Sequence, residues 1–176
     1  MKTVEATIEG ICPMLMHRYN MDNETVEKKA VRKDRQFDPK EDAENSMYKN
    51  TSGEVYIPSS WIEATLRDTS KEFRGRGKAS MKATILASVF VEPDEILLGK
   101  KTYDEIDRRP CLVQRQRIVR SRPKFHPGWK ATFKINFDEE RVQPEALKQI
   151  LEEAGKSKGI GDYRPKFGRF KVISFK

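Results

Sequence analysis

The sequence has few of the side chains that bind transition metals or form disulfides. It contains two cysteines, Cys12 and Cys111, and two histidines, His17 and His126. Neither cysteine lies in a CxxC pair, and the four residues do not have the spacing of a zinc site. We therefore expect no metal or other cofactor, and we expect both cysteines to be reduced and packed as small apolar side chains.

Long apolar runs are also lacking. No segment approaches the ~20 consecutive apolar residues that a membrane-spanning helix needs. The opening MKTVEATIEG has no apolar signal-peptide region after its lysine. These absences predict a cytoplasmic protein that does not enter a membrane. A length of 176 residues predicts one domain, residues 1–176, and a hydrophobic fraction of 36% limits that domain to a modest core.

What the sequence has in excess is positive charge. The formal net charge of +8 favours a polyanionic partner, with nucleic acid first, over the alternative of an ordinary basic surface. Residues 111–134 carry seven lysines and arginines and no acid, and residues 156–176 carry seven against Asp162 alone. Because phosphate contacts supply most sequence-independent affinity for nucleic acid, these two segments are the first candidates for an interface.

Apolar periodicity predicts the longer elements. Residues 3–11 and 129–137 alternate apolar and polar side chains, which is typical of half-buried strands. A helix is predicted to start at 58–60 with a serine N-cap and to end in the RGRGK segment, 74–78. A second helix is predicted to start at Pro144 and to end at Gly155.

The shorter elements complete the expected fold. We expect strands at 54–57 and 170–175, an extended segment at 112–119 and a polar connection at 99–110. We also expect a buried strand at 83–91, for which a helix is the alternative. Residues 95–98 are expected to extend this strand or to pair with it. The order reduces to βαββαβ, which predicts an α+β, ferredoxin-like domain. In that fold both helices cover one face of an antiparallel sheet and leave the other face open.

Residues 20–53 interrupt this pattern. Their acidic and basic residues nearly balance, and few apolar side chains lie between them. Such a segment can bury little surface, so we expect an insertion that projects from the domain, with a weak helix around 24–34.

The segment KGIGDYRPKFGRFKV, 158–172, combines glycines with cations immediately before the last strand. Gly159, Gly161 and Gly168 allow positive φ and close approach of a ligand, and successive N–H groups in such a loop can form an anion-binding nest. The loop lacks the GK[ST] of a phosphate-binding Walker loop and precedes a strand rather than a helix. Five aromatic residues interleave with the cations as candidate base-stacking platforms or, alternatively, as core residues: Phe125, Trp129, Tyr163, Phe167 and Phe170.

The segments already described resemble parts of the RAMP superfamily, the RNA-binding ferredoxin-like proteins of CRISPR effector complexes. GIGDYRPKFGRFKV resembles their C-terminal glycine-rich loop, and IEGICPMLMHRY resembles their first strand and its exit. VYIPSSWIEATLRD resembles the start of their first helix, with Ala64 where the family often has glycine, and RQRIVRSRPKF is similar to small phage-type members. The likeness is greatest to the subunits that form the helical backbone of these complexes.

The resemblance implies that the open sheet face and the glycine loop carry single-stranded RNA. It implies that the insertion, 20–53, acts as a thumb and that copies assemble head-to-tail. The residues that we expect to contact nucleic acid are Arg18, Lys28, Lys29, Arg74, Arg76, Lys78, Arg115, Arg117, Arg120, Arg122, Lys124, Gly159, Gly161, Tyr163, Arg164, Lys166, Gly168 and Arg169.

Three functional hypotheses follow. The first is a non-catalytic single-strand-binding module, with RNA preferred and a stand-alone viral protein for single-stranded DNA as the alternative. The second is an endoribonuclease, for which the resemblance offers two weak catalytic candidates, His17 and Asp22. The third is a subunit that contacts proteins only. The sequence favours the first.

Overall fold

The computed structural model describes residues 1–19, 38–75, 79–113 and 115–176. The chain is α+β, with three separate antiparallel sheets. Among the described residues, no helix has the length and apolar character needed to cross a bilayer.

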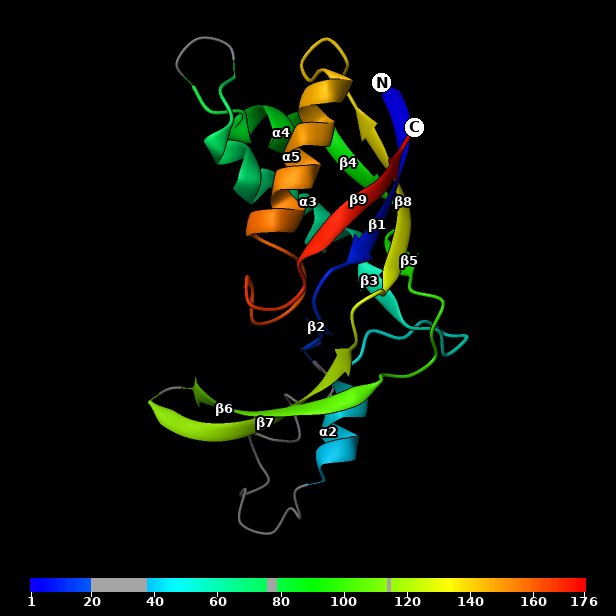
Figure 1. Ribbon diagram of the computed structural model, residues 1–176, viewed down its shortest axis with the longest axis vertical. Coiled ribbons are helices and arrows are strands. Elements are labelled where there is room, and N and C mark those ends of the chain that lie inside the picture. The colour runs from blue at the N-terminus through cyan, green and yellow to red at the C-terminus, as the bar shows by residue number, and fades with distance from the viewer. Residues whose placement is uncertain (20–37, 76–78, 114) are drawn as a thin grey trace.

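The main sheet has the strand order β4-β8-β1-β9, and all neighbours are antiparallel. Its strands are β1 (Lys2–Gly10), β4 (Val89–Glu92), β8 (Lys130–Phe137) and β9 (Phe170–Phe175). Alternate side chains of β1 and β8, such as Ile8 and Phe133, are fully buried, because the helices α3 (Ser59–Thr69) and α5 (Pro144–Ser157) cover that face. Figure 1 shows both helices on the same side of this sheet. The predictions for the first strand, for 129–137 and for 170–175 are confirmed.

A long hairpin lies below the main sheet. It consists of β6 (Glu105–Val113) and β7 (Gln116–Phe125), and β2 (Met14–Leu15) pairs with the base of β7. Its far end projects from the body of the molecule (Figure 1). The prediction of a polar connection at 99–110 is therefore wrong for residues 105–110, which belong to β6. The side chains of this strand are mostly exposed or half-buried, so its sequence lacks the apolar alternation that indicates a strand.

The segment 83–91 is not one strand. Residues Lys82–Ser88 form the helix α4, and only Val89–Glu92 form β4. The buried residues Met81, Ile85 and Ser88 have helical spacing, so the helical alternative holds for the first half. Residues 95–98 do not pair with β4 either, because β5 (Glu95–Leu97) pairs with β3 (Tyr56–Pro58).

The predicted ends of the two long helices need correction. The helix α3 ends at Thr69 and is followed by a 3₁₀ turn, Ser70–Glu72, rather than continuing to the RGRGK segment. Its N-cap is Pro58, without a side-chain cap from a serine. Gly155 lies inside α5 and does not end it, because a Cβ there would lie 2.3 Å from the carbonyl oxygen of Phe170. This glycine lets α5 pack closely on β9.

The described part of the insertion packs against the hairpin. Its helix α2 (Pro39–Asn45) is capped by Asp38, whose carboxylate accepts from the Lys40 N–H at 2.8 Å. Ala43 and Met47 are buried, and α2 packs against β7. These two apolar side chains anchor this segment to the hairpin, so it buries more apolar surface than its composition predicts. The helix expected around 24–34 lies outside the described residues.

Candidate nucleic-acid interface

The glycine loop between α5 and β9 is closed on itself. Gly159, Gly161 and Gly168 have φ of 71°, 82° and 79°. A Cβ at Gly168 would lie 1.7 Å from the carbonyl oxygen of Ile160, whose own N–H donates to the Gly168 carbonyl at 2.9 Å. A residue other than glycine is excluded at position 168 both by the positive φ and by the contact with the Ile160 carbonyl.

The loop is also joined to the strand β2. The Asp162 N–H donates to the carbonyl of Leu15 at 2.9 Å, and the Gly168 N–H donates to that of Pro13 at 2.8 Å. The N–H groups of Gly159, Phe167, Tyr163 and Arg169 are likewise bonded within the protein. The expected anion-binding nest therefore does not fit this geometry. Glycines here make the loop compact, and side chains are left to contact a ligand.

Two arginines connect the loop to the hairpin. The Arg122 Nε donates to the Asp162 carboxylate at 2.5 Å, and the Arg122 side chain is 4% exposed. The Arg109 guanidinium is held by the Asp107 carboxylate and lies 4.6 Å from the ring centroid of Phe167 and 5.4 Å from that of Tyr163. A buried, ion-paired Arg122 positions the loop, and its burial does not fit a direct phosphate contact.

Four of the five candidate stacking residues belong to the core. Phe125, Trp129, Phe167 and Phe170 are all buried. Tyr163 is different, since 44% of it is exposed at the surface of the loop. It is therefore the aromatic residue of this set that a nucleobase can reach.

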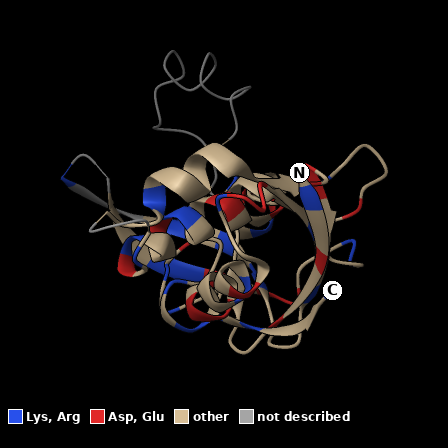
Figure 2. Cartoon of the chain, turned by 90° about the horizontal axis from the view of Figure 1, so that it is seen from above, with Lys and Arg blue, Asp and Glu red and all other residues tan. Residues whose placement is uncertain are grey.

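The cations of the region differ in whether a carboxylate neutralises them. Lys124 is paired with Glu105, and Arg122 and Arg109 are paired as described. Within the described residues, no acidic partner is recorded for Arg164, Lys166 and Arg169 on the loop or for Arg115 and Arg120 on the hairpin. Figure 2 shows lysine, arginine and acidic residues interleaved along the chain. The cations without partners therefore define the interface better than net charge does.

Arg120 lies on the side of the hairpin that carries the loop. It pairs across the hairpin with Arg109, and paired residues of an antiparallel ladder point to the same face. Arg120 on this side of the hairpin, together with Arg164, Lys166 and Arg169 on the loop that carries Tyr163, makes up what we call the loop–hairpin surface.

The remaining predicted residues lie elsewhere or are not described. Arg18 is exposed at the exit of β2, and Arg74 is exposed beyond α3, where its backbone pairs with Ser80. The side chain of Arg117 is not described. Asp22, Lys28, Lys29, Arg76 and Lys78 lie outside the described residues.

The open face of the main sheet is less suited to a polyanion than the resemblance implies. Lys130 and Lys171 both pair with Glu9, at 3.3 and 2.9 Å, and Glu5 lies opposite Lys134. These cations are largely compensated, so the loop–hairpin surface is the stronger candidate.

His17 contacts this surface but is not arranged as a general base. Its Nε2 lies 3.0 Å from Nη1 of Arg120, and its Nδ1 is buried without a hydrogen-bond partner among the described residues. Because a guanidinium can only donate, Nε2 accepts and the proton lies on Nδ1. Burial is the main reason that the pKa of His17 is lowered, and the charges of Arg120 and Arg122 lower it further. The charge of Asp162 opposes this effect only in part. His17 is therefore a neutral acceptor that orients Arg120.

This environment predicts a pH effect on stability. Because the pKa of His17 is lowered in the folded state, the unfolded chain binds more protons once the pH falls below about 6.5, and stability decreases there. We expect His17→Gln to lose less stability than the unaltered protein between pH 7.5 and 5.5, measured by urea unfolding at both pH values. Equal losses in the two proteins would show that His17 is not responsible.

Several residues of the site escaped sequence reasoning. Arg109 and Asp107 lie on a strand that was expected to be a connection. Thr65, on α3, donates to the Gly159 carbonyl at 2.6 Å and accepts from Arg164 at 3.1 Å, so it holds both the loop and one of its cations. Asp162 is the one acidic residue in a basic segment, and this is the sequence feature that could have indicated its ion pair with Arg122.

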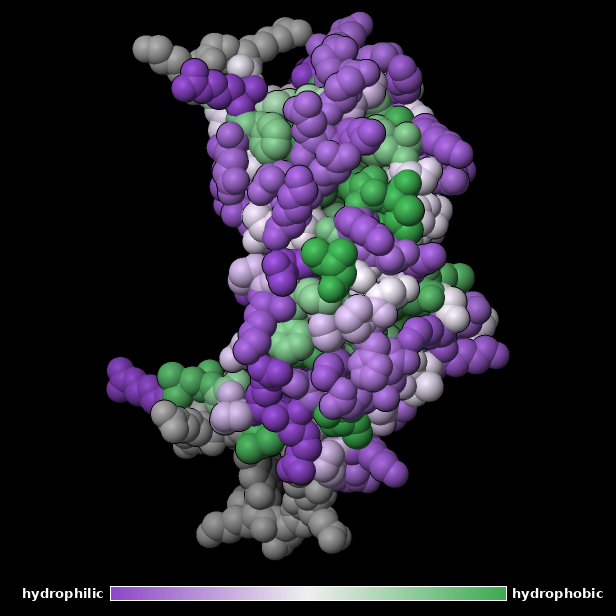
Figure 3. Space-filling model, in the orientation of Figure 1, coloured by the Kyte–Doolittle hydropathy of each residue, from purple (hydrophilic) through white to green (hydrophobic). Residues whose placement is uncertain are grey.

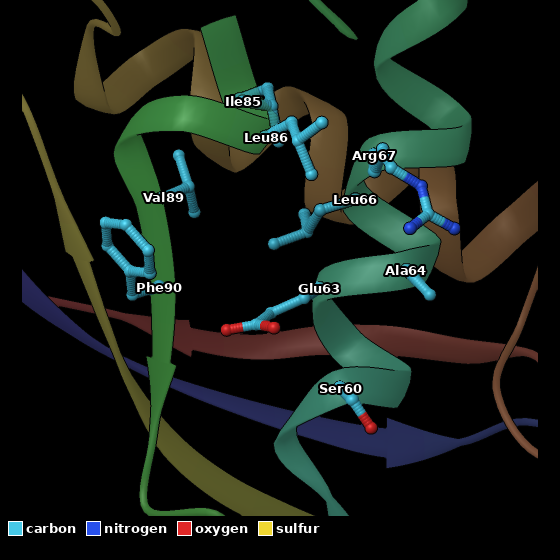
Figure 4. A pocket seen from close by; sticks show the side chains of 9 residues that line it. All are labelled: Ser60, Glu63, Ala64, Leu66, Arg67, Ile85, Leu86, Val89 and Phe90. Carbon is cyan, nitrogen blue, oxygen red and sulfur yellow. The ribbon is translucent and has the colours of Figure 1, made fainter. Parts of the chain in front are cut away.

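A cavity of about 170 Å³ lies between α3 and α4–β4. Figure 4 shows Glu63, Leu66 and Val89 around it. The Glu63 carboxylate already accepts from the Val91 N–H at 3.0 Å, so it serves to hold β4 against α3. We assign this cavity no part in the interface.

Comparison with known proteins gives a fold. No protein-family model and no curated protein matches the sequence. Among solved structures, the chain is similar to a chain of the Type III-B Cmr-beta bound to cognate target RNA, determined by cryo-EM, with a TM-score of 0.58 and 12% sequence identity. The match covers 99% of this chain and 59% of that chain. At this identity the likeness shows a shared fold alone.

Proposed function

We propose that this protein binds single-stranded nucleic acid, with RNA preferred, along the loop–hairpin surface. The observation that carries the proposal is a set of cations with no acidic partner among the described residues, Arg120 on the hairpin and Arg164, Lys166 and Arg169 on the loop that carries the exposed ring of Tyr163. Cations that track a backbone beside an aromatic platform are the arrangement by which single strands are held. The fold shared with a protein that was solved with its target RNA supports RNA as the first choice.

We infer further that β1, α3, β4, β8, α5 and β9 are a ferredoxin-like βαββαβ core of the RAMP type. The sheet order β4-β8-β1-β9 supports this, because it places the first and third core strands at the centre and both helices on one face. In this interpretation the hairpin, together with the insertion 20–53, is an addition to the core.

We also propose that copies assemble head-to-tail on the strand. The projecting half of the hairpin exposes Leu112 by 70% and Val119 by 48%. Figure 3 shows hydrophobic side chains near this end, at the lower left. A projecting apolar element that docks on a different surface of the next copy makes a heterologous contact, and such contacts can continue into filaments.

The experiment that tests the function is fluorescence anisotropy with matched single-stranded RNA, single-stranded DNA and duplex, in a salt series. We expect tight binding to the single strands, with RNA tightest. For single strands the slope of log affinity against log salt is about −0.7 per neutralised phosphate, so the four cations predict a slope of about −3. Tighter binding of DNA would favour the viral DNA-binding alternative, and no binding at low salt would refute the proposal.

A further inference from the structure

A groove of about 580 Å³ opens beside the glycine loop. It is lined by residues of α3, of the end of α5 and of the loop: Asp68, Ser157, Lys158, Gly161, Asp162, Tyr163, Arg164 and Pro165. Its volume lies within the ~300–1,000 Å³ typical of sites for small organic groups. Among the described residues, none of the hairpin lines the groove, so Arg109 and Arg122 contact the Tyr163 ring without lining this groove.

The Tyr163 ring is held in place before any ligand arrives. Arg109 and Arg122 lie 5.4 and 5.9 Å from its centroid, and Phe167 contacts it edge-on at 6.1 Å. The residue has a φ of 61°, which costs a side chain other than glycine on the order of 1–3 kcal/mol. An exposed aromatic residue kept at such a position, in a loop that uses glycine at its other left-handed positions, indicates a purpose for the ring in that place.

The charged groups of the groove are two carboxylates, Asp68 and Asp162, and two cations, Lys158 and Arg164. Lys158 is already paired with Glu72 at 2.7 Å. Asp68 has its Oδ1 near Lys71 at 3.1 Å and Arg67 at 3.6 Å, while no hydrogen bond or ion pair is recorded for its Oδ2 within the described chain. Asp162 holds Arg122 and the Tyr163 N–H, and each carboxylate oxygen has a second lone pair. Burial raises the pKa of Asp68, but Lys71 and Arg67 outweigh it, so the pKa is lowered and the group accepts only. Arg164 supplies positive charge for a phosphate.

We propose that this groove takes one nucleobase of the bound strand, stacked on Tyr163, and that it selects bases with an exocyclic amine. The amine would donate to the carboxylate of Asp68, and the adjoining phosphate would lie near Arg164. Cytosine carries such an amine at the position where uracil carries an acceptor oxygen, which the carboxylates would repel. The inference rests on the proposed function, because it assigns one subsite to the same bound strand.

The test compares cytosine and uracil RNA of equal length, two pyrimidines that differ at this amine. A hydrogen bond to a charged group contributes on the order of 1.5–3 kcal/mol, so we expect oligo(C) to bind the unaltered protein about ten- to a hundredfold more tightly than oligo(U). Asp68→Asn should bring the ratio near one, because the amide can also donate to uracil. Tyr163→Ser should weaken both RNAs by about tenfold or more, and Tyr163→Phe should behave as the unaltered protein.

The outcomes separate the two levels of inference. Tight binding of both RNAs with a ratio near one in the unaltered protein would refute the base subsite and leave the proposed function standing. If Asp68→Asn still prefers oligo(C) over oligo(U), Asp68 is not the acceptor. If Tyr163→Ser binds both RNAs as tightly as the unaltered protein, the base does not stack on Tyr163. No binding to either RNA would refute the proposed function and, with it, the subsite. Circular dichroism of each variant confirms that it is folded.

Discussion

Reversing the charges of Arg164 and Arg169 together should weaken binding to single-stranded RNA by about a hundredfold or more at moderate salt. Each reversal removes a charge-assisted contact of on the order of 1.5–3 kcal/mol and adds repulsion of the phosphate. Neither residue has an acidic partner within the part of the chain that the structure describes, so the reversal leaves no buried carboxylate of that part unpaired. The measurement is the anisotropy titration of Arg164→Glu/Arg169→Glu, with the slope against salt as a second readout.

The control is a double reversal of the same net charge on α5, Lys148→Glu/Lys156→Glu, since both lysines are exposed. If binding depends on net charge alone, the two double variants should lose similar affinity. The loop–hairpin surface predicts instead that the α5 variant loses at most a few-fold. Near-normal binding by Arg164→Glu/Arg169→Glu would show that the strand binds elsewhere.

Gly168→Ala should be among the most destabilising single changes in this chain. The new Cβ would lie 1.7 Å from a backbone oxygen, that of Ile160, which cannot move without breaking the hydrogen bond between these two residues. Overpacking costs about 1–3 kcal/mol and a left-handed alanine about 1–2 kcal/mol more, so we expect a loss of about 3 kcal/mol or more in the free energy of unfolding. Urea unfolding measures this loss.

Gly53→Ala is the matched control for this change. Its φ of 77° is nearly that of Gly168, but no atom lies within 4 Å of its Cβ position. It should therefore show the conformational cost alone, about 1–2 kcal/mol. The difference between the two losses in the free energy of unfolding measures the cost of the contact between a Cβ at position 168 and the carbonyl oxygen of Ile160. Equal losses would mean that the loop can open at position 168 without penalty.

The elements that sequence reasoning placed correctly are those whose pattern is local. The strands around Ile8 and Phe133 alternate because one face of the sheet is buried, and this alternation can be read from neighbouring residues. The hairpin was missed because β6 is stabilised by its ladder with β7, with few buried side chains of its own. The end of α5 was misplaced because Gly155 resembles a helix stop, while its reason is the contact with Phe170.

The candidate site divides in the same way. Composition alone located the two basic segments and the glycine loop. It could not tell Arg122, which is buried against Asp162, from Arg120, which has no acidic partner among the described residues, because both lie in one run of arginines. It also could not choose Tyr163 from five aromatic residues, since exposure is a property of the packed molecule.

The sequence by itself determined the α+β class of the chain, its central strands, its excess of positive charge and the position of its glycine loop, because these depend on residue types and short-range periodicity. The tertiary structure decided which cations are neutralised, which ring is exposed and where a groove opens. Those properties arise from contacts between residues far apart in the chain, such as Arg122 and Asp162, which are 40 positions apart, and no local pattern encodes such a contact.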